Sequence, residues 1–237
     1  MDDQHRLSIF QAQTQNVREL ERTWRHLNRQ INQLILRKDD KGVAIHTKVL
    51  LLVYCALAES IFSKLIHTPH GLSLSEIEQV KIESAERGVK FGWLKCVELS
   101  IQRVPGSNGS HGPNVRRKLE DLIERFIFDP SLIRNKLPHG QWCVALNRDN
   151  TAVNSEITAE IANHDVVELY RRKFALEKLA GVVEDLIESP SKAHHRDYWT
   201  HLTEFEDGQS RLAKWTVQKK IDQLFMKRSL STNKLPS

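Results

Sequence analysis

The chain has little cysteine, glycine or proline, and it lacks any long apolar run. Its 237 residues include 3 Cys, 10 Gly and 7 Pro. Cys55, Cys96 and Cys143 stand far apart and form no CxxC pair, which excludes a disulfide framework and favours a reducing compartment. The longest apolar run, residues 49–58, is too short to span a bilayer. We therefore expect a cytoplasmic protein with no membrane segment.

The composition is that of an ordinary globular protein with a slight excess of positive charge. Hydrophobic residues make up 40% and charged residues 27% of the sequence. The first residues, from Met1 to Arg6, are polar, which argues against a signal peptide. The net charge of +5 favours a polyanionic partner such as RNA, although a mildly basic protein without such a partner has the same charge.

Apolar residues recur at helical spacing over most of the chain and predict an all-α fold. Steps of three and four between residues 17 and 34 indicate an amphipathic helix over residues 14–37 with a coiled-coil-like seam. Residues 43–67 are apolar nearly all round, so we expect this helix at the centre of the core. Further helices are predicted over residues 73–102, with irregularities at Gly88 or Gly92, and over residues 116–128, 131–137 and 165–188, followed by a C-terminal helical region that Gly208 divides.

Shorter signals indicate loops and boundaries. Residues 141–146 alternate weakly ahead of turn residues 147–150, which predicts a small β-hairpin. The tail from Ser229 is expected to be disordered. The chain is thus divided into an N-terminal amphipathic helix (residues 1–41), a helical domain (residues 42–188) and a C-terminal helical extension with a tail (residues 189–237).

The segment most suggestive of chemistry is IRNKLPHGQW at residues 133–142. It combines Arg134, whose guanidinium is able to hold a phosphate bidentately, with Asn135 and His139. An imidazole moves protons near neutral pH. The sequence contains no metal-binding motif, so we expect neither a metal nor a cofactor. An arginine, a carboxamide and an imidazole without a metal point to phosphodiester chemistry.

The local sequence decides whether the arginine and the histidine meet. Asp129 and Pro130 are typical of a helix start, and Pro138 is expected to end that helix. An unbroken helix would leave Arg134 and His139 about 140° apart. A break at Pro138, with a glycine soon after, lets the histidine turn back toward the arginine.

Other basic and histidine-rich segments are less informative. The same arginine–histidine spacing recurs at Arg196 and His201 without a helix break, and we interpret this pair as surface. His194 and His195 are also expected on the surface, because neighbouring residues of a helix point apart and no third ligand is close. The basic runs at residues 116–118, 171–173 and 219–220 suit an RNA backbone, but solvated surface is the preferred interpretation for each.

At Arg134, Asn135 and His139 the chain resembles the HEPN superfamily of all-helical domains, which have an Arg-polar-x(3–5)-His motif. The resemblance covers roughly residues 42–188. Many members of this superfamily are metal-independent endoribonucleases of toxin–antitoxin, phage-defence and CRISPR systems, whereas others have lost catalysis and bind nucleotides or partners. The resemblance implies a HEPN-like bundle with its site at a dimer cleft.

RNA cleavage without a metal needs a base for the ribose 2′-hydroxyl, an acid for the leaving 5′-oxygen and cations for the charge on phosphorus. One histidine cannot readily stand on both sides of an in-line displacement, but a homodimer supplies a second copy. In this interpretation His139 transfers protons, Arg134 holds the scissile phosphate and Asn135 orients the substrate. The alternative is that Arg134 caps a helix and His139 only packs.

Three more residues are candidates for binding or orienting the substrate: Glu59, Lys136 and Trp142. Glu59 lies on the nearly all-apolar helix, where an unpaired carboxylate is costly to bury. It is expected either to pair with Arg134 or to emerge at a helix edge near Lys64. Trp142 is expected either to stack on a base or to cover the core.

The leading hypothesis is a homodimeric endoribonuclease that cleaves RNA by 2′-OH transesterification, as a toxin or phage-defence effector with a cognate antitoxin or inhibitor. The alternative is a catalytically inactive HEPN module that binds RNA, a nucleotide or a partner protein. The dimer is also predicted from surface: the seam at residues 17–34 and the aromatic-rich C-terminal helices offer more apolar area than a core built from residues 42–188 needs.

Overall fold

The computed structural model describes residues 2–107 and 109–232, and this part of the chain is all-α, as predicted. The α-helices are α1 (Asp3–Leu36), α2 (Asp40–Ile66), α3 (Leu74–Arg87), α4 (Val89–Ile101), α5 (His111–Ile123), α6 (Asp129–Lys136), α7 (Ser155–Asn163), α8 (Val166–Glu188), α9 (Ala193–Ala213) and α10 (Val217–Thr232). A π-helical turn, Glu124–Phe128, joins α5 to α6, and a 3-10 turn, Leu137–His139, follows α6.

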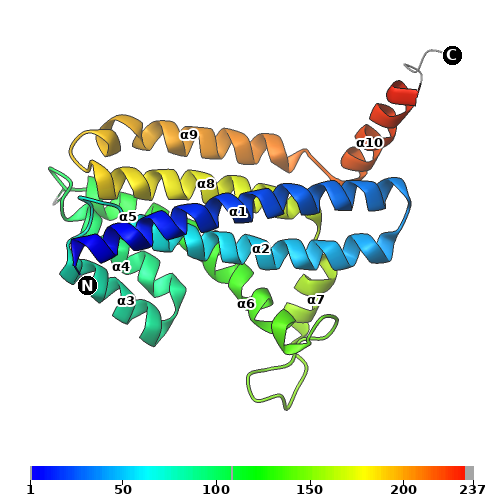
Figure 1. The fold of residues 1–237 in the computed structure, drawn as a ribbon, viewed down its shortest axis with the longest axis horizontal. Coiled ribbons are helices and arrows are strands. Elements are labelled where there is room, and N and C mark those ends of the chain that lie inside the picture. Colours follow the sequence, from blue (N-terminus) through cyan, green and yellow to red (C-terminus); the bar gives the residue numbers. More distant parts are fainter. Residues whose placement is uncertain (1, 108, 233–237) are drawn as a thin grey trace.

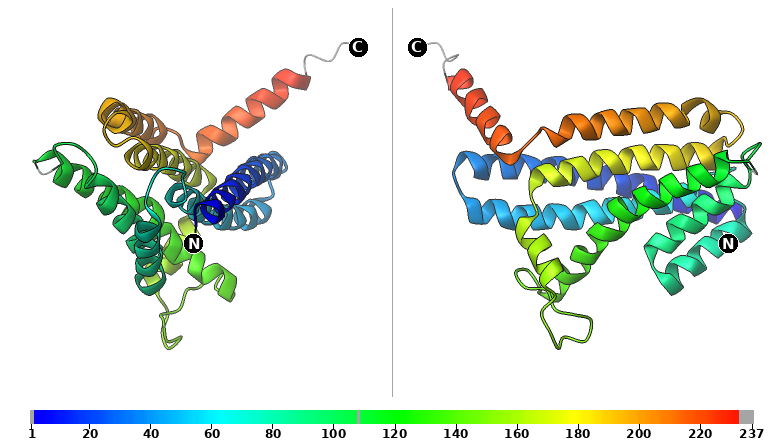
Figure 2. Two further views of the ribbon diagram at one scale, coloured as in Figure 1. Left: turned by 60° about the vertical axis from the view of Figure 1, so that its left-hand side comes forward. Right: turned by 180° about the vertical axis from the view of Figure 1, so that it is seen from behind.

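Four long helices form the body of the molecule. α1 lies along α2, and α8 lies along both α2 and α9 (Figure 1). The predicted central helix is confirmed, because α2 buries residues on most sides, including Leu50, Tyr54 and Phe62. α3 and α4 pack at one end of the bundle, and α10 projects away from it (Figure 2).

The apolar seam of α1 is used within the chain itself. Trp24, Ile31 and Ile35 are buried, and the helix packs along α2. The seam therefore does not remain as the surplus apolar surface from which a dimer was expected. The exposed large apolar side chains of the C-terminal helices are Trp199, Phe225, Met226 and Leu230.

Among the helices that the structure describes, only α2 is long enough and apolar enough to cross a membrane, by length and composition alone. Half of its most apolar window is buried inside the bundle. This is the pattern of a helix at the centre of a core, because the neighbouring helices cover its apolar side chains.

In the first half of the chain the structure has one of the predicted irregularities and moves one predicted helix start. The helix expected over residues 73–102 is broken at Gly88, whose φ of 100° lies in the region that favours glycine. The helix expected from Arg116 begins earlier, at His111.

The capping box that starts α3 is formed by Ser73 and Glu76, with the Ser73 N–H donating to the carboxylate at 2.7 Å.

The C-terminal region differs in two ways. Gly208 does not divide it, because α9 runs through this position and ends at Ala213. Gly208 instead allows close packing of α8 on α9: a Cβ added there would lie 2.2 Å from a ring carbon of Phe174. The residues from Ser229 to Thr232 belong to α10 and are not disordered, and residues 233–237 lie outside the described part.

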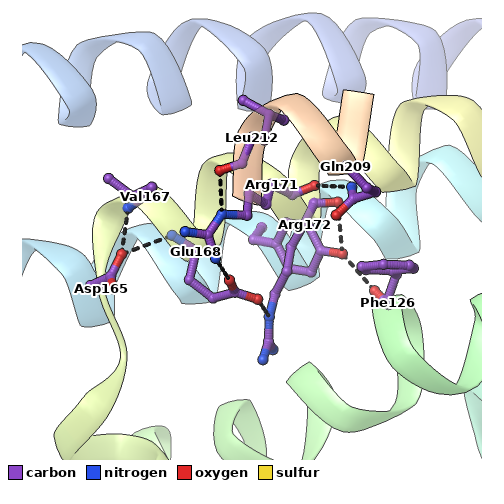
Figure 3. A network of polar contacts seen from close by, with 9 residues as sticks. Phe126, Asp165, Val167, Glu168, Arg171, Arg172, Gln209 and Leu212 are labelled. Carbon is purple, nitrogen blue, oxygen red and sulfur yellow. Dashed lines mark hydrogen bonds and ion pairs between the residues drawn. The ribbon is translucent and has the colours of Figure 1, made fainter. Parts of the chain in front are cut away.

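Polar side chains tie the helices together where α8 begins. Asp165 accepts hydrogen bonds from the Val167 and Glu168 N–H groups, and Arg171 donates to the carbonyl oxygen of Leu212 at the end of α9 (Figure 3). Arg172 pairs with Glu168 at 3.2 Å. The basic run at residues 171–173 is therefore not plain solvated surface, because its first two arginines make contacts within the chain.

Candidate active site

The motif stands at the end of one continuous helical rod. α5, the π-turn and α6 follow one another without a gap. α6 begins at Asp129 with Pro130 in its first turn, as predicted, but Asp129 is not a capping residue, because the backbone before it is already helical and makes no side-chain capping hydrogen bond. The π-turn alters the backbone hydrogen-bonding pattern near Phe126, whose carbonyl oxygen accepts a hydrogen bond of 2.5 Å from the Tyr54 hydroxyl of α2. Burial raises the pKa of Tyr54, which keeps the hydroxyl protonated as a donor. α2 thus fixes the rod that carries the motif.

The helical backbone passes Pro138 before it ends. Leu137, Pro138 and His139 form the 3-10 turn, and Gly140 closes it with a φ of 78°. The Gly140 N–H donates to the Leu137 carbonyl at 3.1 Å and the Gln141 N–H to the Lys136 carbonyl at 3.2 Å. Pro138 changes the type of helix at this point, and the glycine ends it.

Arg134 forms an ion pair with Glu59 of α2, which confirms one of the two expectations for this carboxylate. Lys64, the alternative neighbour, pairs with Glu184 at 2.8 Å. The two side chains are 32% and 47% exposed, so solvent screens the pair. Burial raises the pKa of the nearby Cys55 thiol to about 12, with Arg134 acting in the opposite direction, so the thiol stays neutral beside the pair.

His139 and Asn135 are exposed and line an open cavity of about 740 Å³, which we call the amide cavity. Lys136, Gln141 and Arg148 also line it. Arg134 is not among its lining residues, and no hydrogen bond or ion pair joins Arg134 to His139 in the described residues. Within one copy of the chain, therefore, the arginine is engaged with α2 and the histidine borders the cavity.

Lys136 and Trp142 have structural contacts. The Lys136 Nζ donates to the Leu146 carbonyl at 2.6 Å, which ties α6 to the following loop. Trp142 is partly buried and packs against the core, and its carbonyl oxygen accepts a hydrogen bond of 2.6 Å from Lys48. These contacts favour the core-covering interpretation of Trp142.

The loop after the motif is held mainly by carboxamides. Gln141 Oε1 accepts the Leu146 N–H at 2.7 Å, and Asn147 Oδ1 accepts the Thr151 N–H at 2.9 Å. The predicted β-hairpin is reduced to one antiparallel bridge, Leu146 to Val153, and the described residues contain no strand. Asn154 ends the loop as the N-cap of α7, with its Oδ1 accepting the Ile157 N–H at 3.0 Å.

A second cavity of about 640 Å³ adjoins the amide cavity and is acidic. The two share Asn135, Lys136, Arg148 and Asn154 as lining residues. The second adds Asp129, Glu156 and Glu160. Burial raises the pKa of Asp129 and of Glu160, and the neighbouring Glu124 carboxylate raises that of Asp129 further.

The sequence did not single out Gln141, Arg148 or Asn154 as lining residues. The feature of the sequence that could have indicated them is the density of Asn and Gln between residues 141 and 154. This density predicts a turn, but it does not predict which of the amides line a cavity.

The second histidine region also departs from expectation. His194 is buried, and its Nε2 lies 3.2 Å from the Nε2 of His111, whereas His195 is exposed. At the second arginine–histidine match, Arg196 is exposed as expected, but His201 is partly buried and bonded to Asp185 at 3.1 Å. No cluster of three or more metal-ligating side chains occurs in the part of the chain that the structure describes.

Comparison of the chain with protein-family models, with curated proteins and with solved structures finds no match.

Proposed function

We propose that this protein is a metal-independent endoribonuclease of HEPN type, cytoplasmic and acting as a toxin or phage-defence effector with a cognate inhibitor. The observation that carries the proposal is the exposed His139, which lines a polar cavity large enough for a nucleotide and lies four residues after Asn135 and five after Arg134. His139 has no hydrogen-bond partner within the described residues, so its imidazole is open to a substrate.

The chemistry follows from the ribose. The imidazole of His139 takes the proton of the 2′-hydroxyl, whose oxygen attacks the phosphorus while the bond to the 5′-oxygen breaks. A second imidazole gives a proton to the leaving 5′-oxygen. The products are a 2′,3′-cyclic phosphate and a free 5′-hydroxyl, and no water is consumed in this step. Arg134 offsets the charge that develops on the phosphoryl oxygens.

In this proposal the second imidazole comes from another copy of the chain. Because Arg134 is paired with α2 and does not line the cavity of its own His139, we propose a homodimer that brings the motifs of two copies to one cleft. Such a contact has to form on the side of the bundle that carries α6, whereas α9 and α10, with their exposed apolar side chains, lie on the other side (Figure 1), and the α1 seam is buried.

The test is incubation of the purified protein with RNA in the presence of EDTA. Cleavage that survives the chelator and leaves 2′,3′-cyclic phosphate ends supports the proposal. His139→Ala and Arg134→Ala should each abolish it. Arg196→Ala is the matched control, because it removes an exposed arginine from the second arginine–histidine match. Retained cleavage by the His139 variant, or loss of cleavage in EDTA, would overturn the proposal.

A second candidate is a catalytically inactive module that binds RNA, a nucleotide or a partner protein. The Arg134–Glu59 ion pair favours it, because the carboxylate already neutralises the charge that catalysis needs. RNA binding without cleavage would support this candidate.

A further inference from the structure

The amide cavity has a wall whose hydrogen-bonding character is fixed by the backbone. A backbone N–H only donates, so the side-chain atom that it contacts must be an oxygen. The N–H of Leu146 contacts Gln141 Oε1 at 2.7 Å, and the N–H of Ile157 contacts Asn154 Oδ1 at 3.0 Å. Both amides are thereby oriented, and their NH2 groups are left for another partner.

These NH2 groups have no acceptor within the described residues, and both side chains line the cavity. Beside these two amides the wall adds a donor and a cation, whereas Asn135, His139 and Asn150 also line the cavity and are able both to donate and to accept. The Lys136 ammonium donates to the Leu146 carbonyl, and the exposed Arg148 carries a fixed positive charge. Asn147 has its oxygen occupied by backbone N–H groups as well. The wall therefore suits a ligand that presents acceptors.

A phosphate is the less favourable occupant of the wall that this cavity shares with the acidic one, which His139 does not line. Asp129, Glu156 and Glu160 line the adjoining cavity, which shares Asn135, Lys136, Arg148 and Asn154 with this one. Their negative charge opposes a phosphate dianion at the shared wall. A neutral acceptor such as a base carbonyl meets the same N–H donors without this repulsion.

We propose that the amide cavity binds the acceptor edge of a keto base of RNA, uracil or guanine, through the NH2 groups of Gln141 and Asn154. The proposal rests on the proposed function in that the base belongs to the RNA strand whose phosphate lies at His139. Guanine offers O6 and N7 as adjacent acceptors, and uracil offers O4. Cytosine and adenine place an amino group at the same position, where two donors would face each other.

Uracil and cytosine provide the sharpest comparison, because they have nearly the same shape and differ in the group at this edge. We expect uridine monophosphate to bind at least about tenfold more tightly than cytidine monophosphate, as measured by calorimetric titration in EDTA. Equal affinity for the two nucleotides, or no binding of either at millimolar concentration, would overturn the proposal.

The variant that tests the residues is Gln141→Glu combined with Asn154→Asp. Each new carboxylate still accepts the backbone N–H that holds the loop or caps α7, and aspartate caps a helix as well as asparagine does. Neither substituted side chain retains an NH2 group that could donate to the base. We expect the ratio of uridine to cytidine monophosphate affinities to fall to about one or to invert, with the circular dichroism spectrum unchanged.

The added negative charge weakens the binding of both nucleotides through their phosphates, so only the ratio is interpreted. Ser155→Asp is the control, because Ser155 is exposed beside Asn154 and the substitution adds charge without removing a donor. This control variant should weaken the binding of both nucleotides equally and leave the ratio of their affinities unchanged. A double variant with the parent ratio would overturn the proposal.

The cleavage assay separates the two proposals. If RNA is cleaved in EDTA but the two nucleotides bind with equal affinity, the proposal of base recognition is wrong and the proposed ribonuclease activity is supported. If uridine monophosphate is preferred through Gln141 and Asn154 but RNA is not cleaved, the base pocket stands and the catalytic function fails.

Discussion

The contact between Arg134 and Glu59 gives the most direct test of whether the motif arginine serves chemistry or structure. The two side chains are 32% and 47% exposed, which is the range in which an ion pair contributes only about 0.2–1 kcal/mol. In a chain of 237 residues, 1 kcal/mol corresponds to a shift of about 2–4 °C in melting temperature. Arg134→Ala should therefore lower the melting temperature by no more than about 4 °C.

The same substitution should have a much larger effect on cleavage. Removing one group that stabilises the developing charge typically costs about 10²–10³ in kcat, which corresponds to about 2.7–4 kcal/mol. Glu59→Gln should keep cleavage within about tenfold of the parent, because the amide oxygen still accepts a hydrogen bond from the guanidinium. A double-mutant cycle measured by urea denaturation should give a coupling free energy below about 1 kcal/mol.

Two results would refute this reasoning. A loss of more than about 3 kcal/mol in the free energy of unfolding of Arg134→Ala would mean that the arginine is a buried structural contact. Parent-level cleavage by a folded Arg134→Ala protein would mean that the motif arginine has no catalytic role.

Three further predictions concern the scaffold. Burial lowers the pKa of His164 and of His194 to about 4, from 6.5 in the unfolded chain. The stability that these neutral imidazoles contribute is therefore complete above pH 6.5 and is lost as the pH falls toward 4. The free energy of unfolding should drop over this window, and a constant value from pH 7 to 4.5 would contradict the prediction. Gly208→Ala should lower the free energy of unfolding by about 1–3 kcal/mol, because its Cβ would overlap a ring on α8, whereas Ser210→Ala on the exposed side of α9 should not lower it. Tyr54→Phe should cost about 1–3 kcal/mol by removing the buried hydrogen bond to the π-turn carbonyl, and an unchanged urea midpoint would show that this hydrogen bond contributes little.

The sequence predicted the helices whose apolar pattern is local. α2 and α8 were each expected within a few residues of their observed bounds, because every turn of each helix places apolar side chains toward the same neighbours. The end of α1 was expected within one residue, but its start lies at Asp3 and not at residue 14. The all-α class followed from these long elements.

The errors occurred where a contact between distant segments decides the local structure. Gly208 was interpreted as a helix break, whereas the reason for a glycine is the ring of Phe174 on the neighbouring helix. The capped helix start expected at Asp129 is instead continuous with a π-turn, and the Phe126 carbonyl of this turn accepts a hydrogen bond from Tyr54, 72 residues earlier. His194 was expected on the surface but is buried beside His111, 83 residues away in the sequence.

The candidate site was only partly predictable for the same reason. The pairing of Glu59 with Arg134 was one of two expectations, because a carboxylate on an apolar helix needs a cation. The orientation of the Gln141 and Asn154 amides depends on which backbone N–H groups the loop brings to them, and no spacing rule gives this.

The geometry of the motif links the catalytic proposal to assembly. In one copy of the chain Arg134 is held at α2, and His139 borders a cavity that the arginine does not line. In-line displacement requires an acid and a base on opposite sides of one phosphorus, with a cation beside its oxygens. A single copy offers one motif histidine, so the proposed mechanism requires the motifs of two copies to meet. A monomer that cleaves RNA at concentrations where light scattering detects no dimer would therefore refute the two-histidine mechanism, even if His139 proved essential.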